Sequence, residues 1–175
     1  MRRIIHKKFF NRDAHIVARD LLGREIRRRI GSRVVRAVIT ETEAYMGPHD
    51  KASRAHRGLT KRTAPMFGHP GTLYVYLVYG MHYCLNLVTR EKGYPAAVLV
   101  RAVRLLPSGI LINGPGRVTR ALAIAKSFNN KNIFSDKRLM LGPRHFTPKQ
   151  IRKTPRIGVP YAGAWAHKPL RFLIE

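Results

Sequence analysis

The sequence predicts one compact domain of mixed α and β structure. The chain has 175 residues and 45% hydrophobic content, which suffices for one substantial core and is too little for two. Long runs rich in β-branched and aromatic residues indicate strands, and two segments carry apolar residues at helical spacing. We therefore expect residues 1–175 to form a single domain.

The first element that the sequence predicts is a short helix from Asp13 to Leu22. Apolar residues between these limits recur at helical spacing. Asn11 or Asp13 can cap the N-terminus, and Gly23 follows as a stop signal.

The stretch from Glu25 to Tyr45 is rich in β-branched residues and ends in ETEAY. Strand periodicity places Glu41, Glu43 and Tyr45 on one face of a strand. The chain has only nine acidic residues against 34 Lys and Arg, so two carboxylates this close together need a reason. A solvated face or nearby arginine partners would be one. Chemistry would be another, because a carboxylate can activate water and stabilise a cationic, sugar-like transition state.

Residues 47–71 are rich in Lys, Arg, His, Pro and Gly, which predicts a long irregular loop that faces a ligand. The next run, TLYVYLVYGMHYCLNLV, predicts a β-hairpin with Gly80 in its turn and Tyr79 near its tip. Hairpin tyrosines ordinarily pack across the strands. An aromatic ring at the tip can instead stack on bases or wedge into a duplex.

A further strand is predicted for AAVLVRAVRLL, residues 96–106. After NGPGR, apolar residues recur at helical spacing from Val118 to Phe128. A helix start flanked by Gly114 and Gly116 leaves backbone N–H groups free for an anion such as phosphate.

The formal net charge of +25 predicts a polyanionic partner, with nucleic acid ahead of a membrane surface. The apolar stretch from Thr72 to Val88 is too short and polar to span a membrane. Lys7 and Lys8 interrupt any signal peptide, so we expect a cytoplasmic protein. A single cysteine, Cys84, and histidines without paired ligand spacing predict no metal site, and we expect no cofactor.

Five segments occur in the same order as in one known family: ETEAYMGPHDKAS, MFGHPGTLYVYLVYGMHYCLNLV, VLVRAV, NGPGRVTRALAI and TPRIGVPYAGAWAHKPLRF. Together they resemble the alkyladenine (3-methyladenine) DNA glycosylases of base-excision repair. The resemblance implies an α+β domain with a curved, mostly antiparallel, partly open barrel-like sheet, flanking helices and a protruding hairpin that inserts into DNA. It implies a monofunctional enzyme that flips alkylated or deaminated purines out of double-stranded DNA and leaves an abasic site. The implied substrates are 3-methyladenine, 7-methylguanine, hypoxanthine and ethenoadenine, and we expect a monomer.

The resemblance also implies roles for single residues. Glu43 matches the general base that activates the attacking water, and Arg101 an arginine that helps to hold this water. Glu41 is then structural. The other candidates are Tyr45, Arg54, His56, Tyr76 and Asn86 around the base, Tyr79 in the gap that the base leaves, and Arg62, Gly114, Gly116 and Arg117 on the DNA backbone.

The chain departs from the family pattern at Arg54, where the family usually has a histidine that borders the base; His56 lies two residues on. A guanidinium pointing into the pocket would repel a cationic base, whereas one pointing outward would contact phosphate. Because arginines in basic loops beside DNA mostly contact phosphate, we expect Arg54 to point outward.

Two alternatives remain at this stage. A small basic nucleic-acid-binding protein without catalysis would explain the charge and the aromatic residues, but not the combination of Glu43 with Tyr45, Tyr76 and Tyr79. A glycosylase that has lost its activity is the other alternative, because of Arg54.

Overall fold

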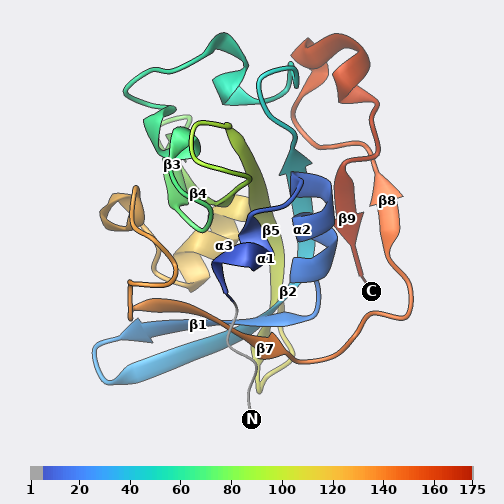
Figure 1. The fold of residues 1–175 in the computed structure, drawn as a ribbon. Coiled ribbons are helices and arrows are strands. Elements are labelled where there is room, and N and C mark those ends of the chain that lie inside the picture. Colours follow the sequence, from blue (N-terminus) through green and yellow to red (C-terminus); the bar gives the residue numbers. More distant parts are fainter. Residues whose placement is uncertain (1–5, 175) are drawn as a thin grey trace.

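The structure, a computed structural model, describes residues 6–174. These residues form an α+β fold around one nine-stranded sheet whose strand pairs are antiparallel (Figure 1). The main path is β3-β4-β5-β2-β1-β7; β6 pairs with β5, and β9 pairs with β2 and β8. The mostly antiparallel sheet expected from the sequence is confirmed, and it does not close into a barrel.

The elements are α1 (Lys7–Phe10), α2 (Ala14–Leu21), β1 (Arg24–Ile30), β2 (Arg33–Tyr45), η1 (Arg54–Arg57), η2 (Ala64–Phe67), β3 (Leu73–Val78), β4 (His82–Thr89), β5 (Ala96–Leu106), β6 (Leu111–Asn113), α3 (Pro115–Ala121), η3 (Lys126–Phe128), β7 (Leu139–Arg144), β8 (Arg152–Thr154), η4 (Pro160–Ala166) and β9 (Arg171–Leu173).

The three α-helices pack on one face of the sheet. Residues of α1, α2 and α3 share a single buried cluster with residues of β3, β4 and β5. The predicted first helix is confirmed as α2, with Asp13 at its N-cap. The hydroxyl of Thr42 donates to the carbonyl of Ala18 at 2.9 Å, which fixes the face of β2 that looks toward the helices. In Figure 1, α1 and α2 lie together in front of this part of the sheet.

The opposite face carries the polar and aromatic residues singled out in the sequence. Tyr74 lies opposite Asn86, Asn86 opposite Leu99, and Leu99 opposite Glu43 in three adjacent antiparallel pairs. Directly opposed residues project from the same face, so these four residues form one row across the sheet. Thr42, next to Glu43, points the other way, toward the helices.

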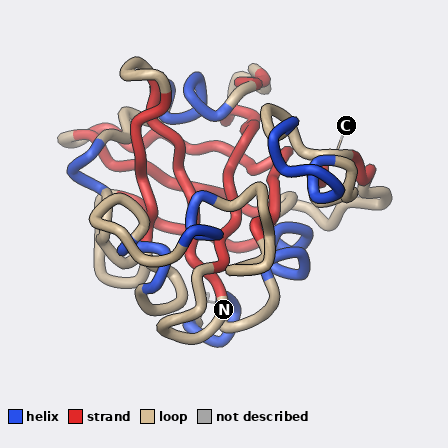
Figure 2. Tube along the Cα trace, turned by 90° about the horizontal axis from the view of Figure 1, so that it is seen from above, coloured by secondary structure: helices blue, strands red, loops and turns tan. Residues whose placement is uncertain are grey.

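Two irregular segments meet at one end of the molecule. The 47–71 loop, which contains η1 and η2, lies beside η4 at the top of Figure 1. Ala52 of the loop is buried with Val159 and Ala162, and Tyr45 packs against them. Figure 2, viewed from above, shows the strands in the middle of the molecule with loops and short helices around them.

The helix predicted through Phe128 is shorter than expected. α3 ends at Ala121, and Ala123 has a positive φ of 46°, a conformation that cannot continue a right-handed α-helix. The Ile124 N–H donates instead to the Thr119 carbonyl at 2.8 Å. Phe128 is still buried, at the end of the separate turn η3. The apolar spacing therefore indicated which residues are buried, but it did not predict where the helix ends.

Candidate active site

The carboxylate of Glu43 lies at the centre of the candidate site and is 0% exposed. Oε1 accepts the backbone N–H of Ile157 at 2.8 Å, and Oε2 accepts the hydroxyl of Tyr45 at 3.0 Å. Arg101 Nε lies 3.5 Å from Oε1. Burial raises the pKa of Glu43, and the charge of Arg101 and the two hydrogen bonds oppose this rise. Each oxygen keeps a lone pair, so the group can still accept a proton from a bound water.

Glu41 has a different environment from Glu43, although both lie on one face as predicted. Its Oε1 accepts Arg101 Nε at 3.0 Å and Arg171 Nε at 2.6 Å. The pairing of β2 with β5 shifts on both sides of Glu41, a β-bulge that re-aims a side chain. Glu41 therefore holds Arg101 in place between the two carboxylates.

Tyr45 is hydrogen-bonded to Glu43, and Tyr76 lies close enough to Tyr45 to raise its pKa. Tyr45 and Tyr76 are both partly buried, and the rings of Tyr74 and Tyr76 lie 4.8 Å apart. Burial, with Glu43 as the next cause, raises the pKa of Tyr45 well above its ordinary value, so its phenol stays protonated and donates to Glu43.

Arg54 lies against the same aromatic group. Its Cζ atom is 4.6 Å from the centroid of the Tyr76 ring, which is cation–π distance. The sequence analysis predicted that Arg54 points outward. The structure instead places its side chain, which is exposed, against the ring of Tyr76. His56 is exposed, and its Nδ1 donates to the carbonyl of Pro48 at 2.7 Å. The structure thus brings Arg54, and not His56, against Tyr76.

Asn86 is 3% exposed and lies in the same row of the sheet as Glu43. Its Nδ2 donates to the carbonyl of Tyr74 at 3.1 Å and to that of Cys84 at 3.5 Å. These bonds fix the amide, with its Oδ1 as an acceptor of defined position.

The predicted hairpin is confirmed as β3 and β4, and Tyr79 at its tip is 88% exposed. Tyr79 and Gly80 both have positive φ, 51° and 67°, as tight hairpin turns require. Arg62 Nη2 donates to the carbonyl of Leu77 at 2.8 Å and so attaches the 47–71 loop to the hairpin. A hollow of about 650 Å³ runs along this contact. It is lined by residues of the loop, the hairpin and η3 with its flank: Lys61, Arg62, Tyr74, Val75, Tyr76, Leu77, Tyr79, Gly80, Tyr83, Lys126 and Asn129.

The predicted backbone-contacting glycines lie beside the start of β4, close to the hairpin turn. Gly114 is the N-cap of α3 and has a φ of 106°. A Cβ on Gly116 would stand 2.8 Å from the Cβ of His82, so the hairpin packs there only against glycine. A second hollow, of about 480 Å³, is lined by His82, Asn113, Gly114, Gly116, Arg117 and Arg120.

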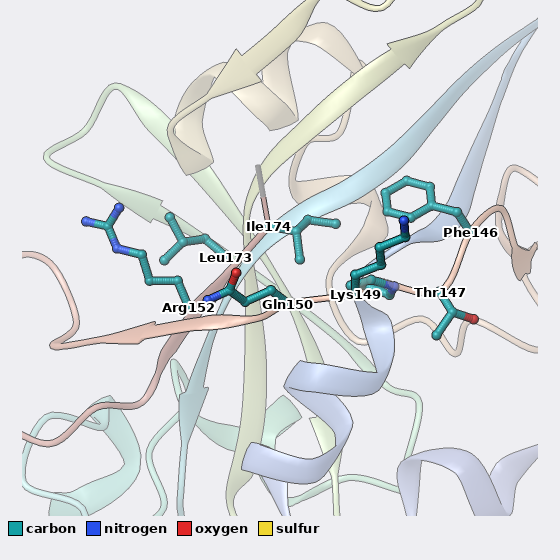
Figure 3. Close-up of a pocket in the computed structure, with 8 residues that line it drawn as sticks. Phe146, Thr147, Lys149, Gln150, Arg152, Leu173 and Ile174 are labelled. Atoms are coloured by element: carbon teal, nitrogen blue, oxygen red, sulfur yellow. The ribbon is translucent and has the colours of Figure 1, made fainter.

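A third cavity, of about 540 Å³, contains none of the candidate residues. It lies between the segment from Phe146 to Arg152 and the residues Leu173 and Ile174 (Figure 3).

Within residues 6–174 no group of three or more His, Cys, Asp or Glu side chains could hold a metal ion. No helix in the part of the chain that the structure describes has the length and apolar character needed to cross a membrane.

Three residues of the site were missed in the sequence: Asp50, Arg156 and Ile157. Asp50 and Arg156 are both 0% exposed and paired with each other, and Ile157 donates its N–H to Glu43. The available signal was the scarcity of acidic residues in the chain, which also drew attention to Glu41 and Glu43. Asp50 stands alone in a basic segment, and nothing local identifies its partner.

A buried carboxylate beside a tyrosine, an exposed aromatic residue at the tip of a hairpin and hollows lined by basic residues are the features that a DNA glycosylase needs. The sequence profile of the methylpurine-DNA glycosylase (MPG) family matches residues 8–175, and the chain belongs to this family. The resemblance drawn from the sequence is thereby confirmed. The protein is a DNA-binding hydrolase of base-excision repair, so the alternative of a small basic nucleic-acid-binding protein from outside this family is excluded.

Curated relatives agree with this assignment, and each carries the name "Putative 3-methyladenine DNA glycosylase". A protein of Myxococcus xanthus is 45% identical over 179 residues, which cover 97% of this chain and 89% of the relative. A protein of Legionella pneumophila is 40% identical and covers 100% of this chain and 96% of its own length. A protein of Methanocella arvoryzae is 40% identical, with 97% and 91% covered.

Proposed function

We propose that this glycosylase removes both alkylated and deaminated purines, including 3-methyladenine, 7-methylguanine, hypoxanthine and ethenoadenine, by monofunctional hydrolysis. The observation that carries the proposal is the buried Glu43 carboxylate, held by Ile157 and Tyr45 beside Arg101. Tyrosine rings near it offer stacking surfaces that suit any purine, charged or neutral.

Glu43 acts in this proposal as the general base. A water held between Glu43 and Arg101 gives its proton to the carboxylate while its oxygen bonds to the anomeric carbon of the deoxyribose. The bond from that carbon to the base breaks, and its electrons leave with the base. The carboxylate stabilises the positive charge that develops on the sugar. A pKa raised by burial brings the base closer to the working pH, where general-base catalysis is most efficient.

Water, and not an amine of the protein, attacks the sugar. The groups bound to the Glu43 carboxylate come from Tyr45, Arg101 and Ile157, and none of them is an amine nucleophile. Without a covalent imine the DNA backbone stays intact. We therefore propose that the product is an unbroken strand with an abasic site.

The remaining candidates bind the DNA in this proposal. Tyr45 and Tyr76 stack on the extruded base, while Arg54 and His56 border it and Asn86 screens its exocyclic groups. Tyr79 fills the gap in the duplex, since its ring is exposed at the hairpin tip and apolar wedges support unstacked steps. The backbone contacts come from Arg62, Gly114, Gly116 and Arg117, beside the two hollows at the hairpin. The enzyme needs no cofactor or metal and acts as a monomer in the cytoplasm.

The product distinguishes this mechanism from others. Duplexes that carry hypoxanthine or 7-methylguanine at one position should yield strands that break only after alkali, and an undamaged duplex of the same sequence should stay whole. Strand breakage before alkali would contradict the monofunctional step. Uncut lesion strands after alkali would contradict excision itself.

A further inference from the structure

A buried ion pair joins the 47–71 loop to the segment that precedes η4. Arg156 Nη1 lies 2.6 Å from Asp50 Oδ2, and Nη2 lies 2.8 Å from Oδ1. Both side chains are 0% exposed. Asp50 also accepts the backbone N–H groups of Met46 at 2.9 Å and Ala52 at 3.0 Å. The pair is thus bound to the strand end on one side and to the loop on the other.

The pair holds Tyr45 from three directions. Arg156 Nη1 also donates to the carbonyl of Ala44 at 2.8 Å, and Asp50 binds the N–H of Met46. These residues precede and follow Tyr45. The guanidinium lies 4.8 Å from the centroid of the Tyr45 ring. The hydroxyl of this ring is the donor to Glu43 Oε2.

The pair also holds the second donor to Glu43. Ile157 follows Arg156 directly, and its N–H binds Glu43 Oε1 at 2.8 Å. Arg156 Nη2 additionally donates to the carbonyl of Trp165 at 3.3 Å, which fixes the path of the chain after Ile157. Each oxygen of Glu43 therefore receives its hydrogen bond from a residue that the pair keeps in place.

We propose that Asp50 and Arg156 are positioning residues of the reaction, which fix the Glu43 carboxylate through Tyr45 and Ile157 without touching the substrate. This inference rests on the proposed role of Glu43 as the base. Buried ion pairs contribute little net stability, because desolvation offsets their attraction. Arg156 Nε is buried without a hydrogen-bond partner, so the guanidinium is not placed to maximise its own bonding. Its position instead fixes the neighbouring residues Tyr45 and Ile157.

The test uses the double variant Asp50→Asn/Arg156→Gln, which leaves no unpaired buried charge. Single-turnover excision of hypoxanthine should fall by about 10- to 100-fold, the cost of a small misplacement of a catalytic group. Dissociation constants for an undamaged duplex, in which no base is stacked on Tyr45, should change by less than about threefold, since neither residue contacts DNA in this proposal.

The pH profile supplies a readout that a merely structural role would not move. The titratable and charged groups around Glu43 are Glu41 and Tyr45 on β2, Cys84 on β4, Arg101 on β5, Arg171 on β9, and Arg156. The double variant misaligns the Ile157 and Tyr45 donors and removes the positive charge of Arg156, and each of these three groups lowers the pKa of Glu43. The acidic limb of the excision rate should therefore move to higher pH.

A matched control exists in another ion-pair cluster. Glu25 accepts Arg36 Nε at 2.5 Å and Arg27 Nε at 2.8 Å, and Arg36 and Arg27 lower the pKa of Glu25 to about 2 against the effect of burial. None of these residues contacts Tyr45, Glu43 or Ile157. The variant Glu25→Gln/Arg36→Gln should lose thermal stability but keep both the excision rate and its pH profile.

Two outcomes would overturn the inference. One is wild-type excision with an unshifted acidic limb in the Asp50→Asn/Arg156→Gln protein. The other is a rate loss no larger than that of the Glu25→Gln/Arg36→Gln control. Glu43→Gln, measured in parallel, separates the two proposals: if it retains excision, the role of Glu43 itself fails, whereas a collapse there beside a fully active double variant rejects only the positioning role.

Discussion

Glu41 and Glu43 lie two positions apart on one face of β2, but their surroundings differ. Glu41 is neutralised by Arg101 and Arg171, whereas Glu43 is fully buried and bound by a backbone N–H. The sequence could predict the shared face from strand periodicity alone. It could not predict from that pattern which carboxylate is bound by a backbone N–H, because the donor, Ile157, lies 114 residues away in the chain.

Arg54 gives a prediction at the scale of one residue. Its guanidinium lies over Tyr76, where it would repel a cationic base that stacks on this ring. Arg54→Gln should therefore raise the single-turnover excision rate of 7-methylguanine relative to that of hypoxanthine by about tenfold or more, which is about 1.4 kcal/mol of discrimination. Arg57→Gln, an exposed neighbour in the same turn η1, is the control and should leave this ratio unchanged. An unchanged ratio in Arg54→Gln would show that Arg54 does not select base charge.

At the scale of elements, strong local patterns were enough for α2, the hairpin of β3 and β4, and β5. The alternation of large residues and the Tyr79–Gly80 turn specify the hairpin without help from distant parts of the chain. The strands β8 and β9 have three residues each and no such pattern. They form because β9 pairs with the C-terminal part of β2, at Glu41 to Glu43. This pairing joins segments far apart in the sequence and arises only in the folded sheet.

The hairpin makes a prediction of its own. Tyr79→Ala should weaken binding of a lesion in duplex DNA much more than binding of the same lesion in a single strand, where no gap needs filling. Tyr79→Phe keeps the exposed ring and should bind both substrates as the wild type does. Equal losses for duplex and single strand in the Tyr79→Ala protein would argue against a wedge. Competition binding with the two DNA forms measures the difference.

At the scale of the whole molecule, the acidic residues that the structure describes all have arginine partners. Every Asp and Glu within residues 6–174 lies within 4.0 Å of an arginine nitrogen, and most of these pairs are hydrogen-bonded. The formal net charge of +25 comes from the many lysines and arginines that exceed these carboxylates in number. Composition alone predicted a polyanionic partner. It could not predict that all of these acidic residues would pair with arginines, since half of the pairs join segments that are distant in the sequence.

This distribution separates affinity from chemistry. Attraction to DNA is spread over many lysines and arginines, while the proposed chemistry depends on one carboxylate. Loss of that carboxylate should leave binding largely intact, and the two properties can be measured on the same protein.

The most direct test compares Glu43→Gln with Glu41→Gln on a duplex that contains hypoxanthine, with lesion binding and single-turnover excision measured for each. Glu43→Gln should bind the lesion as the wild type does and excise it more slowly by about 10²- to 10⁴-fold, the range for loss of a general base. Glu41→Gln should lose far less of the excision rate. Wild-type excision by Glu43→Gln, together with a collapse in Glu41→Gln, would contradict the account.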